Sequence, residues 1–426
     1  MRDRAAVVAD GGLTATTTDR RHGRRPSVML RVHYRLTAWW AKVIVVYALS
    51  RVVTTVFLVV LASVQGGNPW TGAHPGYFDF ASIWDGRWYD IVEAGGYPAT
   101  LPLTDDGHVG QNAWAFLPGY PYLVGALMFV TRLPWPVMAA CVSVTFGLGA
   151  ALLFNRLLAP RIGSSAALYA TVLFCVAPTS PLFQLAYAES MFVFLLVLAL
   201  YLLVRRNYAW LMPVVLLLGF VRPGALAFAL ALGLHVVYRW FTRARDPFPV
   251  AERVASMCAT GVAVVAGFAW PAIAAGVTGD LNAYAATELS WRADYIGYHA
   301  LSPFAPWVDA ARWWFHTWLG MPAVLGYVVL ALVVAIFALW MFMPSVRRLG
   351  ADLRLWVASY AIYLLAVFFP QSSTFRLLMP MFPMLGSIAQ PRSRVYRVAM
   401  VIVALALQLG WLLICWGVDG YDWSPP

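Results

Sequence analysis

The sequence predicts an all-helical membrane protein that crosses the bilayer many times. Hydrophobic residues make up 61% of the 426-residue chain, whereas charged residues make up only 12%. An α-helix needs roughly 20 apolar residues to cross the hydrocarbon core, and apolar segments of about that length recur between arginine-containing breaks. We therefore expect a polytopic bundle of about 11 transmembrane helices, with little room for a soluble domain.

The apolar segments follow one another along most of the chain. The first runs from about Trp40 to Ser63, and the later ones are expected at 113–131, 134–154, 164–178, 182–204, 208–221, 224–238, 254–275, 321–343, 355–370, 377–389 and 398–416. If all of them crossed in strict alternation, Arg205 and Arg206 would face outward. One early segment is therefore expected not to cross, and 113–131 is the candidate because its FLPGYPY motif suits a re-entrant or interfacial segment.

The formal net charge of +11 is explained by membrane orientation rather than by nucleic-acid binding. Basic residues hold short loops in the cytoplasm, and four arginine clusters alternate here with loops that are nearly free of them. The clusters are Arg205 and Arg206; Arg239, Arg243, Arg245 and Arg253; Arg347, Arg348 and Arg354; and Arg392, Arg394 and Arg397. With these clusters inside, the two large polar loops, 64–112 and 276–318, share the outer face.

The predicted organisation is one transmembrane domain, 37–416, between two tails. Residues 1–36 are rich in threonine and arginine, which predicts a disordered cytoplasmic tail without a cleavable signal, and 417–426 form a short C-terminal tail. The four cysteines lie in apolar stretches, and the histidines of the outer loops show no metal-ligand spacing. No metal site and no cofactor are therefore expected; a divalent metal is possible but not indicated.

Asp85, in the motif WDGRWYD of the first large loop, is the candidate general base. Trp84 and Trp88 flank it at the membrane boundary, where thinned water raises the basicity of a carboxylate and lets it accept a proton from a hydroxyl. The same pattern is also typical of a solvated loop acid among aromatic residues that anchor the interface.

Three further charged residues are expected on the outer face. Glu189 lies at the mouth of an apolar helix, where it is either functional or a helix N-terminal acid. Arg222 and Arg376 can grip a phosphate, although either can also be a turn charge that reaches the headgroups. Arg292 is a weaker third cation, and Arg51, inside the first span, is expected to pair with another helix or the headgroups.

The sequence disfavours nucleotide chemistry. It contains no phosphate-binding glycine loop of the GxxxxGK[ST] type. A membrane enzyme that acts outside the cytoplasm has no nucleotide sugars available, so its donor is expected to arrive in the bilayer.

The motifs resemble those of a known family. WDGRWYDIVEAGGYP followed by WAFLPGYP is similar to the signature of the PIG-V mannosyltransferases and their bacterial relatives. AYAESMF, LGFVRPG and TFRLLMPMFPM resemble further elements of that family, so that the resemblance runs in order from about residue 80 to 390. The chain departs from the family at VRPG, where asparagine is common, and at Ala188, where serine is common.

The resemblance implies a GT-C-like helical bundle, the class of glycosyltransferases that take sugar from a polyprenyl or dolichyl phosphate. It implies that Asp85 acts as the base, with Glu189, Arg222 and Arg376 near the donor phosphate. Sugar transfer by a single displacement then inverts the anomeric carbon. The sugar or lipid entrance is expected to be lined by Trp84, Trp88, Tyr89, Tyr97 and Tyr120.

The expected function is therefore a glycosyltransferase, in the first place a mannosyltransferase, of the bacterial plasma membrane. Its partners would be the bilayer, a polyprenyl phosphate sugar donor and an extracytoplasmic glycolipid or glycan acceptor, with no nucleic acid. One alternative is a transporter or flippase of lipid-linked sugars, which predicts ionisable residues deep in several helices. The other is a non-catalytic membrane scaffold, for which the loss of Asp85 would have little consequence.

Overall fold

The computed structural model describes residues 37–417 and 425 of the chain. The predicted tail 1–36 and nearly all of the predicted tail 417–426 lie outside the described residues. The chain divides into two units, 1–41 and 42–426, and all contacts discussed below lie in the second.

The described residues are helical, as predicted, and the only β-pairing among them is an isolated bridge between Leu103 and Val109. The helices in chain order are α2 (Trp39–Val64), α3 (Tyr77–Phe80), α4 (Asp85–Gly95), η1 (Ala113–Ala115), α5 (Gly119–Thr131), α6 (Trp135–Ile162), α7 (Ser164–Val176), η2 (Ser180–Phe183), α8 (Glu189–Val204), α9 (Tyr208–Gly219), α10 (Ala225–Thr242), α11 (Val250–Thr278), α12 (Ala283–Ser290), α13 (Ala293–Ile296), α14 (Ala305–Arg312), η3 (Trp313–Trp318), α15 (Ala323–Met341), α16 (Pro344–Arg347), α17 (Ala351–Val367), α18 (Thr374–Leu377), η4 (Met379–Met384), α19 (Leu385–Ile388) and α20 (Arg394–Cys415).

Several helices have the length and composition of membrane spans. Within the described residues, 6 helices are long and apolar enough to cross a bilayer, namely α2, α6, α10, α11, α15 and α20. Shorter apolar helices include α5, α7, α8 and α9. The 13 residues of α5 reach only about 20 Å at 1.5 Å per residue. That is less than the roughly 30 Å of a hydrocarbon core, but α7 and α9, with 13 and 12 residues, are no longer, so the expectation that 113–131 does not cross stays a prediction. The total number of spans stays a prediction.

Two predicted apolar segments are not continuous helices. In the segment 182–204, α8 begins at Glu189, which the sequence placed at the mouth of an apolar helix, and the backbone before it bonds elsewhere: the Ala186 N–H donates to the Ala81 carbonyl at 3.0 Å. The segment 377–389 is divided between α18, η4 and α19. Pro380 and Pro383 lack the N–H groups that a continuous α-helix needs there.

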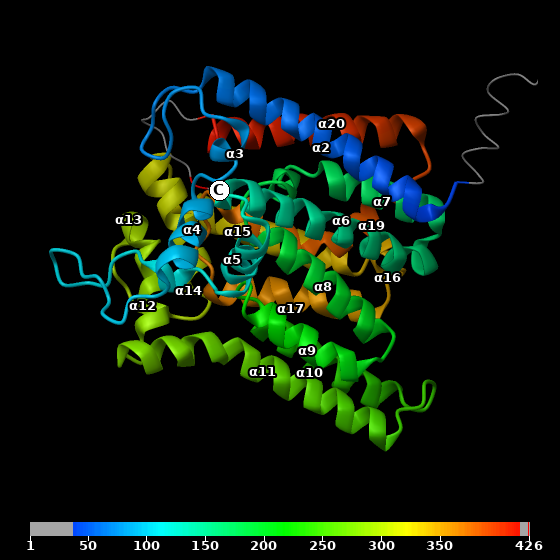
Figure 1. The fold of residues 1–426 in the computed structure, drawn as a ribbon. Helices are drawn as coiled ribbons and strands as arrows, with labels where there is room; N and C mark the ends of the chain where they lie inside the picture. Colours follow the sequence, from blue (N-terminus) through cyan, green and yellow to red (C-terminus); the bar gives the residue numbers. More distant parts are fainter. Residues whose placement is uncertain (1–36, 418–424, 426) are drawn as a thin grey trace, which may run out of the picture. The chain divides into compact units, whose positions relative to one another are not determined.

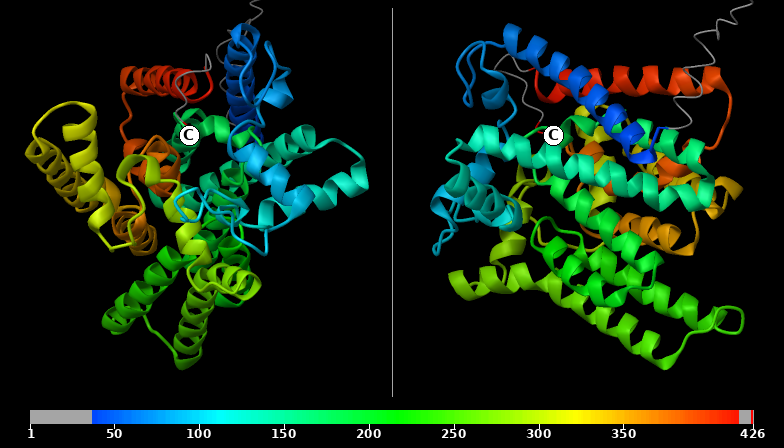
Figure 2. Two further views of the ribbon diagram at one scale, coloured as in Figure 1. Left: turned by 90° about the vertical axis from the view of Figure 1, so that its left-hand side faces the viewer. Right: turned by 45° about the vertical axis from the view of Figure 1, so that its right-hand side comes forward.

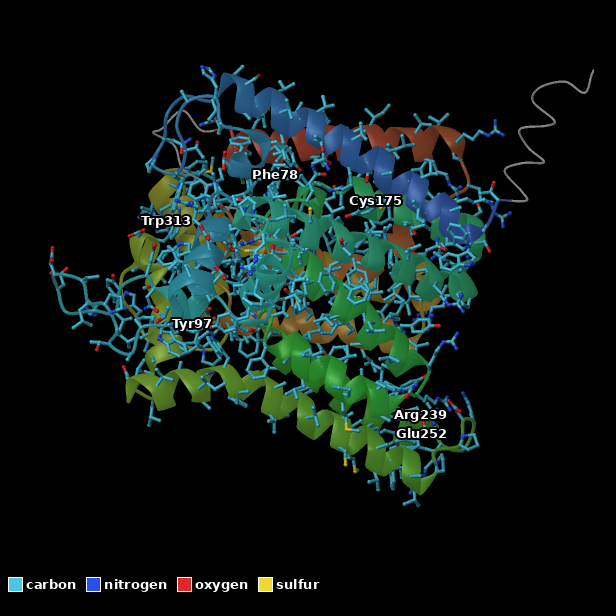
Figure 3. The ribbon with its side chains drawn as sticks, in the orientation of Figure 1. Phe78, Tyr97, Cys175, Arg239, Glu252 and Trp313 are labelled. Carbon is cyan, nitrogen blue, oxygen red and sulfur yellow. The ribbon has the colours of Figure 1, made fainter. Side chains whose placement is uncertain are left out.

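The two large loops lie at the same end of the helix bundle, as predicted (Figure 1). Tyr97 and Trp313 mark this end in Figure 3, whereas Arg239 and Glu252, from one of the arginine clusters, lie at the opposite end. The chain thus separates its large aromatic loops from this arginine-rich turn along the bundle. That the loop end faces away from the cytoplasm stays a prediction.

Helix packing brings segments that are far apart in the sequence into contact. α2 and α20 lie side by side in Figures 1 and 2, and the Thr54 hydroxyl lies 3.3 Å from Gln408 Oε1 between them. α8 is almost entirely buried and packs against α6 and α9. Arg51 is buried within α2 and donates to the carbonyls of Ser180 and Cys175 at 2.6 and 2.8 Å, so it pairs with a neighbouring helix end, as expected.

Candidate active site

Asp85 is the first residue of α4, and the residue before it has an unusual backbone conformation. Trp84 has φ of 60° and ψ of −123°, in the positive-φ region that bulky side chains rarely adopt. Its indole N–H donates to the Cys415 carbonyl at 2.8 Å, and the ring is buried. Packing therefore holds a strained turn next to the candidate base, as is common at functional sites.

The structure brings together the four charged residues that the sequence singled out. Arg376 Nη1 forms an ion pair with Asp85 Oδ2. Arg222 Nη1 lies 2.6 Å from Glu189 Oε1 and 4.0 Å from Asp85 Oδ2, while Arg376 Nε lies 3.4 Å from Glu189 Oε1. These four residues, which we call the ion cluster, come from α4, α8, the α9–α10 turn and α18.

The ion cluster is shielded from solvent but not sealed. The side chain of Glu189 is 4% exposed, whereas those of Asp85, Arg222 and Arg376 retain 15%, 13% and 11%. Two cations and two anions balance the formal charge, which is what buried charges require. One buried oxygen, Glu189 Oε2, has no hydrogen-bond partner.

The carboxylates keep both arginines charged despite burial. Burial alone would lower the pKa of Arg376, but Asp85 and then Glu189 raise it above its ordinary value. Burial likewise opposes the charge of Arg222, but Glu189, together with Tyr89 and Asp85, outweighs it, so that the pKa of Arg222 is also raised. Two permanent cations suit the binding of a phosphate.

Close backbone contacts hold the cluster's elements together. Gly86 allows α4 to lie against the segment before α8, since a Cβ at this position would sit 3.3 Å from both the Cβ and the carbonyl oxygen of Ala186. Gly119, at the start of α5, donates its N–H to the Phe220 carbonyl at 2.8 Å, two residues before Arg222. The turn that carries Arg222 is thus fixed by α5.

Tyr187 is a residue of this site that the sequence analysis missed. It is fully buried, its hydroxyl accepts the Asp85 N–H at 3.2 Å, and the Arg376 guanidinium lies 5.7 Å from its ring centroid. Burial, followed by the negative charge of Asp85, raises the pKa of its hydroxyl, which therefore stays protonated. The position of Tyr187 two residues before Glu189 was the one signal in the sequence that could have identified it as a site residue.

Glu288, on α12, is a second such residue. It was visible in the sequence as an acid of the second large loop, but not as a site residue. Burial raises its pKa to about 7, although a hydrogen bond from Tyr284 and the charge of Arg222 oppose that shift. Because Asp85 and Arg376 also act on it electrostatically, Glu288 lies within electrostatic reach of the ion cluster.

Aromatic residues join the two large loops beside the ion cluster. The Trp88 ring stacks on Phe116 at 5.4 Å between centroids and meets Trp291 edge-on at 5.6 Å. Trp88 lies three residues after Asp85, and Trp291 lies three residues after Glu288. One helical turn therefore separates each acid from this aromatic contact.

The other aromatic residues predicted to line an entrance are engaged in packing. Trp84, Tyr89 and Tyr120 are buried at 8%, 2% and 0% exposure, and the Tyr120 hydroxyl donates to the Ala139 carbonyl at 2.9 Å. Tyr97 stacks on Trp114 at 4.7 Å and donates to the Phe116 carbonyl at 2.7 Å. These contacts account for the four side chains, and their role at an entrance stays a prediction.

Arg292 makes its described contacts elsewhere. It is 6% exposed and donates to the His299 carbonyl at 3.0 Å, within its own loop. Burial lowers its pKa, with Asp309 opposing that shift. This hydrogen bond stabilises the conformation of the loop, and the role of Arg292 as a third cation toward substrate stays a prediction.

Among the described residues, no group of three or more histidine, cysteine, aspartate or glutamate side chains is placed to hold a metal ion. His108 instead stacks on Tyr298 at 4.2 Å, and the His74 ring nitrogen lies 2.8 Å from the Ser63 carbonyl oxygen.

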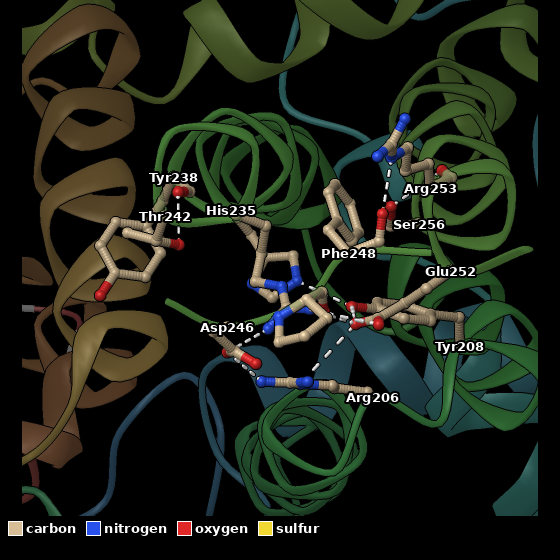
Figure 4. Close-up of polar contacts among 12 residues, drawn as sticks. Arg206, Tyr208, His235, Tyr238, Thr242, Asp246, Phe248, Glu252, Arg253 and Ser256 are labelled. Carbon is tan, nitrogen blue, oxygen red and sulfur yellow. Dashed lines mark hydrogen bonds and ion pairs between the residues drawn. The ribbon is translucent and has the colours of Figure 1, made fainter. Parts of the chain in front are cut away.

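A second group of charged residues lies at the opposite end of the bundle (Figure 4). Arg239, 3% exposed, donates to Glu252 Oε1 at 3.0 Å and also pairs with Asp246. Arg206 pairs with the same Asp246 and lies 3.6 Å from Glu252. Asp246 and Glu252, the acids that pair with these arginines, connect the α8–α9 turn to the end of α10 and the start of α11. These ion pairs were not predicted from the sequence.

A buried histidine extends this group. His235 Nε2 lies 2.8 Å from the Tyr208 hydroxyl, and its Nδ1 lies 2.7 Å from Asp352 Oδ1. The Tyr208 hydroxyl is also 3.3 Å from Glu252 Oε1. These contacts connect α9, α10, α11 and α17, so we interpret this group as one that stabilises helix packing rather than as a second functional site.

Comparison with known proteins gives only remote similarity. No family model matches the chain, and no curated protein matches it. Among solved structures, it is similar to the oligosaccharyltransferase AglB from Archaeoglobus fulgidus in complex with an inhibitory peptide and a dolichol-phosphate, at 14% identity and a TM-score of 0.42, covering 91% of this chain and 57% of that chain. A second Archaeoglobus fulgidus oligosaccharyltransferase structure, tethered to an acceptor peptide, matches at 11% identity and a TM-score of 0.40, covering 90% of this chain and 56% of that chain. The chain thus spans little more than half the length of either protein. Membership of the PIG-V family stays a prediction.

Proposed function

We propose that the protein is a membrane glycosyltransferase that moves a sugar from a polyprenyl phosphate to an acceptor hydroxyl. The observation that carries the proposal is the ion cluster, in which two arginines and two acids from four separate elements gather at the loop end of a helical membrane protein. Arginine pairs suit a lipid phosphate, and a neighbouring carboxylate suits the proton of the acceptor.

The ion pairs give the donor phosphate a defined role. Arg376 is engaged with Asp85 and Arg222 with Glu189, so a phosphate that binds both arginines competes with these carboxylates. Its arrival releases Asp85 from Arg376 and leaves the carboxylate free to act as a base. The base would thus become available only when donor is present, which limits side reactions with water.

The transfer step then balances. Asp85 takes the proton of the acceptor hydroxyl, whose oxygen forms a bond to the anomeric carbon. The bond from that carbon to the phosphate oxygen breaks at the same time, and its electron pair leaves with the polyprenyl phosphate. Arg222 and Arg376 neutralise the charge that develops on this leaving group. One displacement inverts the anomeric carbon.

The finer assignments rest on the motif resemblance. They are mannose as the sugar, a polyprenyl phosphate as its carrier, and a glycolipid or glycan as the acceptor. The resemblance and the arginine distribution also favour a bacterial plasma membrane with the site on the extracytoplasmic face.

The test is the transfer of radiolabelled mannose from polyprenyl phosphate mannose into membrane lipids and glycans. We expect Asp85→Asn to lower the rate by about a hundred- to ten-thousand-fold, the usual contribution of a general base. Asp90→Asn is the matched control, because Asp90 lies on the same helix but contacts Arg87 rather than the ion cluster.

Each result has a distinct meaning. Loss of transfer in Asp85→Asn with retention in Asp90→Asn supports the enzyme and its base. Equal transfer by wild type and Asp85→Asn removes Asp85 from the mechanism. If wild type transfers no sugar but moves lipid-linked sugar between the leaflets of a proteoliposome, the protein is a flippase and the proposal is wrong.

A further inference from the structure

The C-terminal end of α20 contacts the chain that leads into Asp85. The Trp84 indole N–H donates to the carbonyl of Cys415, the last residue of α20, at 2.8 Å. In return, the indole N–H of Trp416 donates at 3.1 Å to the carbonyl of Phe80, the last residue of α3. Figure 1 shows this end of α20, in red, beside α3. Cys415 and Trp416, which we call the α20 end, thus hold the chain between α3 and Asp85.

We propose that the α20 end positions the catalytic base Asp85, with Trp416 as the positioning residue. Trp416 acts through Trp84 on one side and through Tyr187 on the other. The inference rests on the proposed function, in which Asp85 accepts the proton of the acceptor. It is carried by hydrogen bonds and ring contacts that lead from the α20 end to Asp85 along two separate routes.

The first route is the strained backbone of Trp84. Its φ of 60° is a conformation that a tryptophan adopts only where the surrounding contacts impose it. The Cys415 carbonyl is one of the last carbonyls of α20, which have no partner within the helix, and the Trp84 indole supplies its hydrogen bond. Because Asp85 directly follows Trp84, a change in the Trp84 backbone would redirect Asp85.

The second route runs through the Tyr187 ring. The Trp416 ring lies 5.8 Å from the Tyr187 ring, measured between centroids, and both side chains are fully buried. The Tyr187 hydroxyl accepts the N–H of Asp85 at 3.2 Å. This N–H belongs to the first turn of α4, where N–H groups have no partner within the helix. Trp416 therefore supports the side chain that fixes the start of α4.

These contacts matter because the Asp85 side chain has to change partners. In the proposed reaction the donor phosphate takes Arg376 from Asp85, so this ion pair no longer aligns the carboxylate with the acceptor hydroxyl. A displacement of about 1 Å can lower a rate about a hundredfold. The hydrogen bonds of the α20 end go to Trp84 and Phe80 rather than to the ion cluster, so they persist while the ion pairs exchange.

The test compares Trp416→Phe with wild type in the full-length protein, by sugar transfer and by hydrogen–deuterium exchange. Trp416→Phe removes the indole N–H and keeps an aromatic ring. We expect kcat, measured per folded protein, to fall about ten- to a hundredfold, because the base is misaligned. The donor concentration for half-maximal rate should stay the same, since the arginines that bind the phosphate are unchanged. Exchange in the peptide 81–88, which contains the Asp85 N–H, should become faster.

A double substitution separates positioning from packing. If Trp416 acts through Asp85, Trp416→Phe has little further effect on the residual transfer of Asp85→Asn, because the base that it positions is already missing. A packing role alone would lower the rate by the same factor in both backgrounds and would overturn the inference.

Trp411→Phe is the matched control. Trp411 is also buried near the end of α20, and its ring lies 5.4 Å from the Trp416 ring, but its indole N–H makes no hydrogen bond to any residue that the structure describes. We expect this variant to keep the wild-type kcat and the wild-type exchange at 81–88. Trp84→Phe covers the case in which Trp416→Phe does not fold, because it removes the donor to the Cys415 carbonyl and should lower kcat in the same way.

The failure of this inference differs from the failure of the proposed function. If Asp85→Asn abolishes transfer while Trp416→Phe and Trp84→Phe keep the wild-type kcat, the α20 end does not position the base and the proposed function stands. Faster exchange at 81–88 without a loss of kcat likewise overturns the inference, since the reaction then tolerates a looser turn. If wild type transfers no sugar, the proposed function fails and the positioning role fails with it.

Discussion

Asp85 is held between two arginines, and this arrangement determines how a substrate can reach it. A buried carboxylate with only one cation would be costly to leave unpaired, whereas the ion cluster offers each acid an alternative partner. Arg222 lies within 4.0 Å of Asp85 while it bonds Glu189, so a partner exchange needs only small movements. The strained Trp84 backbone and the Tyr187 hydroxyl keep the aspartate in place during such an exchange.

Glu288 gives a stability prediction at the same scale. Its pKa of about 7 in the folded protein lies above the ordinary 4.5. The folded state therefore keeps a proton that the unfolded state has lost, and stability falls as the pH rises from about 4.5 to 7. Glu288→Gln removes this dependence. We expect wild type to lose up to about 3 kcal/mol relative to Glu288→Gln across this window, at 1.36 kcal/mol per pH unit.

Thermal unfolding of both proteins in detergent between pH 4 and 8 measures this difference. Asp294→Asn is the control, since it removes an exposed acid of the same loop. A constant difference between wild type and Glu288→Gln at every pH would show that Glu288 is an ordinary surface acid.

Elements, rather than single side chains, set the geometry of the ion cluster. α4 lies on the segment before α8 because Gly86 leaves room for Ala186, and α5 contacts the turn before Arg222 through Gly119. Both glycines occur within the motifs that resemble the PIG-V family, WDGRWYD and FLPGYPY. Close backbone approach explains why a residue without a side chain is needed in each motif.

Gly119→Ala tests this explanation. The added Cβ would lie 2.8 Å from the Phe220 carbonyl oxygen and 2.9 Å from Val221 Cγ2, so the backbone before Arg222 has to move. We expect a loss of about 1–3 kcal/mol in stability, typical of overpacking, together with weaker use of the donor. The measurements are the unfolding midpoint and the donor concentration for half-maximal transfer.

Gly95→Ala is the matched control, because no atom lies within 4 Å of the added Cβ and the residue ends α4 away from Arg222. If Gly119→Ala behaves like Gly95→Ala in both measurements, α5 does not position the Arg222 turn.

The sequence allowed the helices and the cluster members to be predicted because each leaves a local signal. A long apolar run indicates a span, and an isolated charge such as Arg222 or Arg376 contrasts with its surroundings. Which residues pair with one another left no such signal, because the Asp85–Arg376 ion pair joins positions 291 residues apart. Buried residues such as Tyr187 resemble ordinary core residues in the sequence.

In the whole molecule, two groups of paired charged residues lie at opposite ends of the helix bundle. The loop end holds the neutral ion cluster, while the opposite end holds Arg206 and Arg239 with their acid partners. The fold requires both large loops to face the same compartment, since Trp88 of the first loop contacts Trp291 of the second. The positive-inside rule predicts that this compartment lies outside the cytoplasm.

Labelling of single cysteines with a membrane-impermeant maleimide tests this orientation. In a background with the four native cysteines replaced by alanine, Thr100→Cys and Asn282→Cys report on the two large loops, and Ala244→Cys reports on the arginine-rich turn; all three positions are exposed. We expect the first two to react in intact cells and Ala244→Cys to react only after permeabilisation.

Reaction of all three in intact cells would indicate leaky cells rather than topology, so a cytoplasmic marker protein is monitored in parallel. Labelling of only one of the two loops would separate Asp85 from Glu288 across the membrane and contradict the fold. Labelling of Ala244→Cys alone would place the ion cluster in the cytoplasm, where nucleotide sugars are available and a lipid-linked donor is no longer required.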